Sequence, residues 1–185
     1  MGCDIHPRAE VRINGVWRLS PLEIPSDRNY ITFAALANVR NGVGFAGSPT
    51  HQRIPFIAEP RGLPDDLSAG SIDMLTADDF TFGDHSFSWV TLLEMRLYPA
   101  PDINRTGLCL PKDINGTGRP KEWCSDVYGT GADKYVRHNW TEPFKDAAPL
   151  FTDIMSRLSW MEADSTDASP LVTDIDIRLV FGFDS

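Results

Sequence analysis

The sequence predicts an α+β fold, in which a mostly antiparallel sheet includes both chain termini and packs against two to three helices. Three observations lead to this prediction. Apolar and polar residues alternate near the start and again near the end of the chain, as in half-buried strands. Between these ends, two longer stretches repeat their apolar residues with helical spacing. A chain of 185 residues suits one hydrophobic core, so we expect a single domain over residues 1–185.

The N-terminal strand signal continues into a hairpin. Asn14-Gly15 separates two alternating runs, and both residues tolerate the positive φ angles of a tight hairpin turn. The second run is Val16 to Leu19. One side of the first run is charged, and the other side is formed by Cys3, Ile5, Ala9, Val11 and Ile13.

The first helix is predicted over residues 26–39. Ser26 or Asp27 can cap its start, because their side chains accept a hydrogen bond from the first free amides. Asn41-Gly42 is expected to end it, because either residue adopts the left-handed conformation of a helix stop.

Two further helices follow. Thr91 and Glu94 have the spacing of a capping box, which opens a helix toward Tyr98. Residues 149–161 repeat their apolar positions with helical spacing, and Pro149 suits the first turn, where its missing amide hydrogen costs nothing.

Three more strands are predicted. Residues 54–58 and 86–89 form short ones, and residues 173–181 form a long strand that we expect to pair with the N-terminal hairpin. In this last strand we expect Ile175, Ile177 and Leu179 in the core, with Asp174 and Asp176 more exposed.

The region from Pro99 to Pro143 shows no sustained periodicity. It is rich in Pro, Gly, Asp and Asn, yet it contains aromatic residues. We therefore predict a long irregular loop or insertion over residues 99–143. Loops of this length inside a domain often bind something.

Composition narrows the range of partners, and the sequence predicts a cytoplasmic location. The net charge of −9 is opposite to that needed for binding duplex nucleic acid. No apolar run is long enough to span a membrane, and the N-terminus lacks the features of a signal peptide. The three cysteines, Cys3, Cys109 and Cys124, form no Cys-x-x-Cys pair and are expected to be thiols. In that compartment, Asn-x-Thr sequons such as the one at Asn104 are incidental.

Short segments spread over the chain resemble one protein family. The chain opens with Met1-Gly2-Cys3-Asp4-Ile5-His6, and further matching segments are Arg28-Asn29-Tyr30, Leu36-Ala37-Asn38-Val39-Arg40, Pro60-Arg61-Gly62-Leu63-Pro64, His85-Ser86 and Arg178-Leu179-Val180-Phe181. Taken together, they resemble a family of small phage and prophage proteins known by that start. The resemblance implies a phage origin and a bacterial host cell.

One group of polar residues suggests a metal or catalytic site. Asp4 and His6 point to the same face of a strand, and Asp-x-His can present two ligands to one metal. His85 could complete such a site, so Asp4, His6 and His85 are candidate ligands for a divalent metal, the one cofactor considered. They are also the candidate catalytic residues if the protein is an enzyme. The alternative is a solvated polar strand face.

A second group suggests an anion site. Arg61 lies between Pro60 and Gly62, where a stiff loop could aim a planar guanidinium at a phosphate or carboxylate. Arg28 and Asn29 lie at the predicted start of a helix, which favours anions, and Arg40 lies near its end. The alternative is that Arg28 and Arg40 are surface charges.

Two tryptophans complete the candidate ligand-binding residues. Trp123 and Trp140 fall in the predicted loop and could stack on a base or a partner. Trp17, Trp89 and Trp160 fall in regular elements and are expected in the core.

Small phage proteins meet host defences that signal through nucleotides, so the resemblance favours a role against such a defence. With local arginines in an acidic chain, it predicts a homo-oligomer that binds and sequesters a small anionic, nucleotide-like ligand. The alternative is a phosphodiesterase-type hydrolase acting through a metal or through general acid–base catalysis. We expect no membrane partner.

Overall fold

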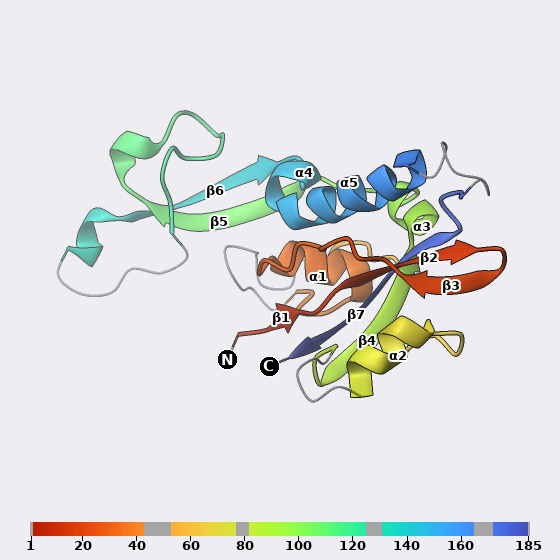
Figure 1. The fold of residues 1–185 in the computed structure, drawn as a ribbon. Coiled ribbons are helices and arrows are strands. Elements are labelled where there is room, and N and C mark those ends of the chain that lie inside the picture. Colours follow the sequence, from red (N-terminus) through yellow and green to blue (C-terminus); the bar gives the residue numbers. More distant parts are fainter. Residues whose placement is uncertain (1, 43–52, 77–81, 125–130, 165–171, 185) are drawn as a thin grey trace.

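The computed structural model describes residues 2–42, 53–76, 82–124, 131–164 and 172–184, and it shows a body from which an arm projects (Figure 1). The body contains one antiparallel sheet of five strands. These are β1 (Asp4–Ile5), β2 (Arg8–Ile13), β3 (Val16–Leu19), β4 (His85–Thr91) and β7 (Ile177–Asp184). Strand β7 is central, because it pairs with β1, β2 and β4. The predicted α+β class, with both termini in one sheet, is confirmed.

The predicted hairpin is also confirmed. Ile13 pairs with Val16 across the turn. Asn14 and Gly15 have φ angles of 51° and 79°, the left-handed values that a two-residue hairpin turn requires.

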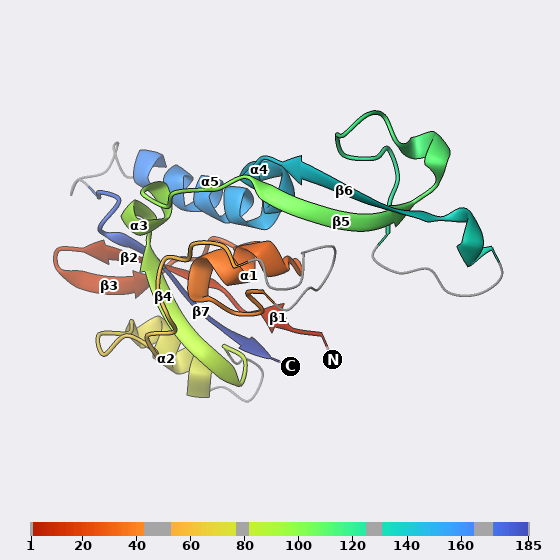
Figure 2. The ribbon, with the colours of Figure 1, turned by 180° about the vertical axis from the view of Figure 1, so that it is seen from behind.

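Helices cover both faces of the sheet. On one face lie α1 (Tyr30–Ala37), α3 (Leu92–Arg96), α4 (Phe144–Ala147) and α5 (Pro149–Asp164). On the other lies α2 (Ala69–Thr76), as Figure 1 and Figure 2 show from opposite sides. The capping box of Thr91 and Glu94 and the helix from Pro149 were predicted correctly. Two of these five described helices, α2 and α4, were not predicted.

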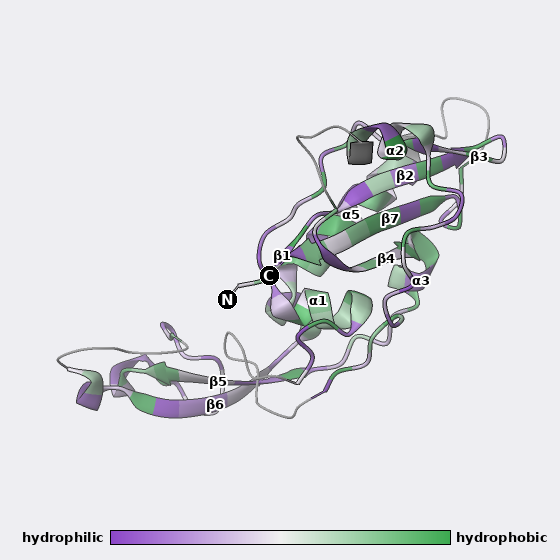
Figure 3. Ribbon diagram, turned by 90° about the horizontal axis from the view of Figure 1, so that it is seen from below, coloured by the Kyte–Doolittle hydropathy of each residue, from purple (hydrophilic) through white to green (hydrophobic). Residues whose placement is uncertain are grey.

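The hydrophobic core lies between the sheet and the helices α1 and α5, which cover one of its faces. Phe33 of α1 meets Phe183 of β7 edge to face, with ring centres 5.1 Å apart. Ile154 and Leu158 of α5 are fully buried. Helix α1 is buried from Ile31 to its end, and it is drawn largely in hydrophobic green in Figure 3. Its burial, and not an amphipathic pattern, is what fixes this helix in place.

Helix α1 is shorter than predicted at both ends. Asn29, not Ser26 or Asp27, is its N-cap, and its side chain accepts from the Thr32 amide at 2.8 Å. Asn38 ends it, with a left-handed φ of 58°. The predicted stop lay three residues too late, because Asn38 already adopts the left-handed conformation that ends a helix, which asparagine does at some helix ends in place of glycine.

The C-terminal strand begins later than predicted. Residues 173–176 form a turn, in which the Asp176 side chain accepts from the amide and hydroxyl of Thr173 at 3.2 and 2.7 Å. Ile177 and Leu179 are buried as expected, but Ile175 is 48% exposed, so its predicted burial is wrong. The side-chain bonds of Asp176 favour the turn over an extended backbone.

The predicted irregular loop over residues 99–143 is wrong in its main part. Strands β5 (Ile103–Cys109) and β6 (Val136–Glu142) pair in register along their whole length. With the residues between them, which include the short 3-10 helices η1 (Pro111–Asp113) and η2 (Ala132–Lys134), they form the arm, residues 103–142. The sequence of these two strands shows only weak alternation of apolar and polar residues, because many side chains on both faces are polar, and the strands were therefore not predicted. In contrast, the predicted strand at 54–58 is irregular backbone.

Candidate functional site

The face of the sheet that carries α2 is polar near one end, and it forms the candidate site. Side chains of paired residues point to the same face, so the pairs Glu10–Arg178 and Arg12–Trp17 place four polar or aromatic side chains together. Trp89 of β4 pairs with Val180 and joins this face. The strand alternation that buries Leu179 on the core side therefore places a row of arginine and tryptophan side chains on the other side of the sheet.

Arginine and tryptophan alternate along this row. The Arg178 guanidinium carbon lies 3.9 Å from the ring centre of Trp17 and 5.9 Å from that of Trp89. Arg12 lies 5.3 Å from Trp17, and Arg61 lies 4.9 Å from Trp89. Each guanidinium is within the distance at which a cation is attracted by the ring. The five residues form a continuous ladder.

Arg178 is buried at the centre of the ladder. Its Nε donates to Glu10 at 2.8 Å and its NH1 to Asp66 at 2.6 Å, and the Arg178 and Glu10 side chains are 2% and 0% exposed. Glu10 also accepts from the Ser68 amide and the Ser71 hydroxyl at the start of α2. These bonds hold α2 and the preceding loop against the sheet. The hydrogen bond from Arg178 keeps the pKa of Asp66 below its ordinary value.

Arg61, the last residue of the ladder, lies on the Pro- and Gly-containing loop in which the sequence analysis placed it. Gly62 has a φ of 78°, and its amide donates to the Phe87 carbonyl of β4 at 2.8 Å. Arg61 donates through two nitrogens to Glu94, at 2.6 and 3.2 Å, and through NH1 to the Trp89 carbonyl at 3.2 Å. The guanidinium is therefore oriented by α3 and by β4.

The ladder lines an open cleft of about 670 Å³, which we name the Trp–Arg cleft. Its wall contains the five ladder residues together with Leu63, Pro64, Asp65, Asp66, Thr91 and Ile175. The size is within the range of small-molecule sites. The exposed Ile175 thus lies in the wall of a cleft. The alternation of apolar and polar residues in the sequence could not predict this position.

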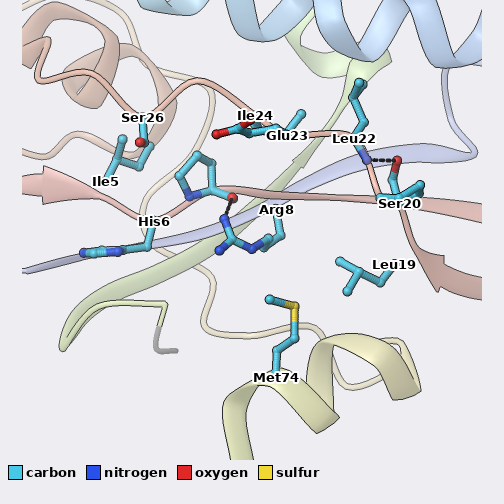
Figure 4. A pocket seen from close by; sticks show the side chains of 12 residues that line it. Ile5, His6, Arg8, Leu19, Ser20, Leu22, Glu23, Ile24, Ser26 and Met74 are labelled. Carbon is cyan, nitrogen blue, oxygen red and sulfur yellow. Dashed lines mark hydrogen bonds between the residues drawn. The ribbon is translucent and has the colours of Figure 1, made fainter. Parts of the chain in front are cut away.

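A second cavity, of about 490 Å³, lies between β1, β2, the segment after β3 and α2 (Figure 4). Its lining includes His6 from the link between β1 and β2, Arg8 from β2 and Met74 from α2. Arg8 donates to the Pro7 carbonyl at 2.7 Å, and burial lowers its pKa. Among the described residues that line this cavity there is no Trp, Tyr or Phe, so it is less suited to a planar ligand than the Trp–Arg cleft.

Asp4 and His6 lie together at the end of the sheet, but each contacts another residue of this chain. Arg28 donates to both oxygens of Asp4 at 2.6 and 2.7 Å, and His6 Nε2 lies 2.9 Å from Asp184. His85 stacks on Phe183, two strands away from β1, and its Nδ1 lies 2.9 Å from the Ser86 hydroxyl. Within the described ranges, no three His, Cys, Asp or Glu side chains group closely enough to hold a metal ion. The geometry offers the predicted metal no support.

The remaining predicted anion residues have partners within the protein. Arg28 pairs with Asp4, and the amide group of Asn29 donates to the Ala147 carbonyl at 3.1 Å while its oxygen caps α1. Arg40 lies beyond α1, with a φ of 57°, and its hydrogen bond lowers the pKa of Cys3, which burial raises more strongly. None of the three lines the Trp–Arg cleft.

Trp123 and Trp140 lie in the arm, and neither lines the Trp–Arg cleft. Trp140 is on β6, not in a loop, and it is 3% exposed. Trp123 packs against it edge to face at 5.1 Å, and Arg105 lies over Trp123 at 5.2 Å. The burial of Trp140 gives its ring a role in the core of the arm.

Sequence reasoning found Arg61 but missed most of the cleft. Trp17 and Trp89 were expected in the core, and Arg178 was not among the candidate site residues. The available signal was the polar alternation in β2 and β7, which places Glu10 and Arg178 on the same face once the strands are paired. That pairing was predicted, but the cover provided by α2 was not.

Because several carboxylates around the cleft have lowered pKa values, we predict that acid destabilises the protein. Hydrogen bonds lower the pKa of Asp66, and they do so for Glu94 and Asp176 against the opposing effect of burial. A lowered pKa means that the stabilisation is complete above the ordinary values of 3.8 for Asp and 4.5 for Glu, and is lost as the pH falls through the folded values.

We therefore expect the melting temperature to stay level from neutral pH to about pH 5 and to fall steeply below pH 4. Thermal melts across this range measure it. Asp66→Asn should flatten the fall, and a melting temperature that rises on acidification would contradict the assignment.

Comparisons with protein-family models, with curated proteins and with solved structures find no match. The resemblance to the phage family therefore stays a prediction. Among the described residues, no helix has both the length and the apolar character that a membrane span requires.

Proposed function

We propose that the Trp–Arg cleft binds a small nucleotide-like ligand and holds it without converting it. The ladder of Arg12, Trp17, Arg178, Trp89 and Arg61 carries the proposal, because it combines flat aromatic surfaces with cations at both ends. A nucleobase stacks on such rings, and a phosphate accepts from a guanidinium fork.

The rim supplies the groups that would read a base. Asp65 and Asp66 line the cleft and are exposed, and carboxylates accept from the amino and imino groups of a base. The acids do not block a phosphate, because the pairs Arg61–Glu94 and Arg12–Asp176 are partly exposed. Such pairs contribute only about 0 to 1 kcal/mol, so exchanging the carboxylate for a phosphate costs little.

In this proposal the protein is a phage accessory protein that acts in the cytoplasm of a bacterial host. It removes a nucleotide signal of a host defence by sequestration, and it does so as a homo-oligomer. Binding is favoured over hydrolysis because Asp4, His6 and His85 lie outside the cleft and because Asp4 and His6 are held by Arg28 and Asp184.

The test is incubation of the purified protein with a panel of cyclic and linear nucleotides. The protein fraction is then denatured, and the released compounds are identified by mass spectrometry. Intact nucleotide in stoichiometric amount supports sequestration. Altered nucleotide with turnover would replace the proposal with hydrolysis, and no interaction with any nucleotide would overturn both.

Arg61→Lys is expected to weaken nucleotide binding by about 1 to 3 kcal/mol, the scale of a charge-assisted hydrogen bond. Lysine keeps the charge but loses the planar fork and its stacking on Trp89. Titration calorimetry with the retained nucleotide measures the loss. Arg96→Lys, on the far side of α3 with carboxylates of its own, is the matched control and should bind normally. Equal affinities for all three proteins would place the site elsewhere.

A further inference from the structure

Three Asn-x-Thr triads lie in the arm: Asn104-Arg105-Thr106, Asn115-Gly116-Thr117 and Asn139-Trp140-Thr141. The first is in β5 and the third is in β6. Residues two apart in a strand point to the same face. Each strand triad therefore presents one amide and one hydroxyl on the same face of the arm.

The register of the two strands brings these groups together. Asn104 pairs with Thr141, and Thr106 pairs with Asn139. Paired side chains point to the same face, so the four residues form a two-by-two arrangement, which we name the Asn/Thr array. The Thr141 hydroxyl donates to the Asn104 side-chain oxygen at 2.8 Å.

A cavity of about 700 Å³ borders the array. Asn104, Thr106, Asn139 and Thr141 all line it, and Thr117 of the middle triad adds a third hydroxyl. All three triads thus contribute to one cavity. Its volume is in the range of sites for ligands of drug size.

An ordinary solvated strand face does not account for this choice of residues. Asparagine is disfavoured in strands, and a two-stranded ribbon has little stability to lose. The charged side chain of β5, Arg105, belongs to the other face, because its strand partner is the buried Trp140. It lies over Trp123 and 3.4 Å from Glu142, which balances its charge, although Arg105 and Trp140 also line the cavity.

We propose that the Asn/Thr array is a second binding site, which takes a neutral polyhydroxylated ligand, an oligosaccharide. Amide and hydroxyl groups both donate and accept hydrogen bonds, as the hydroxyls of a sugar do. The four side chains of the array carry no charge, and Arg105, the charged residue among the described lining of the cavity, is paired with Glu142, which distinguishes this site from the Trp–Arg cleft. This site goes beyond the proposed function and does not depend on it.

The test is saturation-transfer NMR and titration calorimetry with neutral oligosaccharides built from glucose, mannose, galactose or N-acetylglucosamine, at millimolar concentration. We expect at least one to bind, and the double variant Asn104→Ala/Asn139→Ala to weaken that binding at least tenfold. Asn115→Ala is the matched control, because it changes the same residue type in the arm outside the array, and it should bind as the unchanged protein does. Arg61→Lys should also leave saccharide binding intact.

Two results would overturn the proposal: no saccharide of the panel binds, or binding survives in the double variant. If the double variant unfolds, Thr106→Val/Thr141→Val removes two hydroxyls while favouring the strand conformation. The same tenfold loss is expected there, and full binding would again overturn the proposal.

Discussion

Replacing Arg178 with methionine is expected to lower the free energy of unfolding by about 3 to 5 kcal/mol. The variant leaves Glu10 buried without its opposite charge, and it removes the two hydrogen bonds that Arg178 donates to Asp66. Methionine fills a similar length, so the loss comes mainly from the stranded carboxylate and not from a cavity. Chemical denaturation of the purified variant measures the change.

Two controls separate this effect from the loss of any arginine. Arg12→Met breaks a partly exposed pair with Asp176 and should cost only about 0 to 1 kcal/mol. The double variant Arg178→Met/Glu10→Gln removes the stranded charge, so it should recover part of the stability lost in the single variant. If Arg178→Met is no worse than Arg12→Met, the Arg178–Glu10 pair does not anchor the sheet.

This buried pair also links stability to the candidate site. Desolvating two charges is costly, and apolar residues of similar volume often stabilise a protein as well or better. Here the pair positions Arg178 between Trp17 and Trp89, and it holds the start of α2 through Ser68 and Ser71. The arrangement is best explained by the shape that it gives to the cleft.

The parts of the fold that could be predicted from the sequence are those encoded by neighbouring residues. Asn14-Gly15 forms its turn from two adjacent φ angles, and the box of Thr91 and Glu94 closes within one helical turn. Helix α2 was missed because its position depends on Glu10, which is 58 residues away from Ser68. A short segment with a weak pattern is recognised only when its distant partner is known.

The candidate site also has one part that neighbouring residues encode and another part that depends on residues distant in the sequence. The prolines and glycine around Arg61 predicted a stiff loop with an aimed side chain. The partners that orient Arg61 are distant, since Glu94 is 33 residues away and Trp89 is 28 residues away. Alternation in β7 predicted a polar face for Arg178, but it could not show that α2 and two tryptophans cover that face.

The second large effect is expected at Gly182, near the C-terminal end of β7. A side-chain carbon there would overlap the backbone carbonyl of Phe82 and would lie 2.7 Å from the Phe87 ring. Backbone cannot give way as the end of a flexible side chain can. Gly182→Ala should therefore cost about 3 kcal/mol or more, at the upper end of the range for overpacked cores.

Gly118→Ala is the matched control, because the nearest atom that its new carbon meets is the Asn115 carbonyl oxygen, at 3.9 Å. We expect its free energy of unfolding to stay within about 0.5 kcal/mol of the unchanged protein. Chemical denaturation of both variants gives the comparison. Since β7 pairs with three strands, a strained Gly182→Ala must either displace the Phe82 backbone or loosen the central strand. Full stability of this variant would mean that Phe82 does not pack on β7 as closely as described.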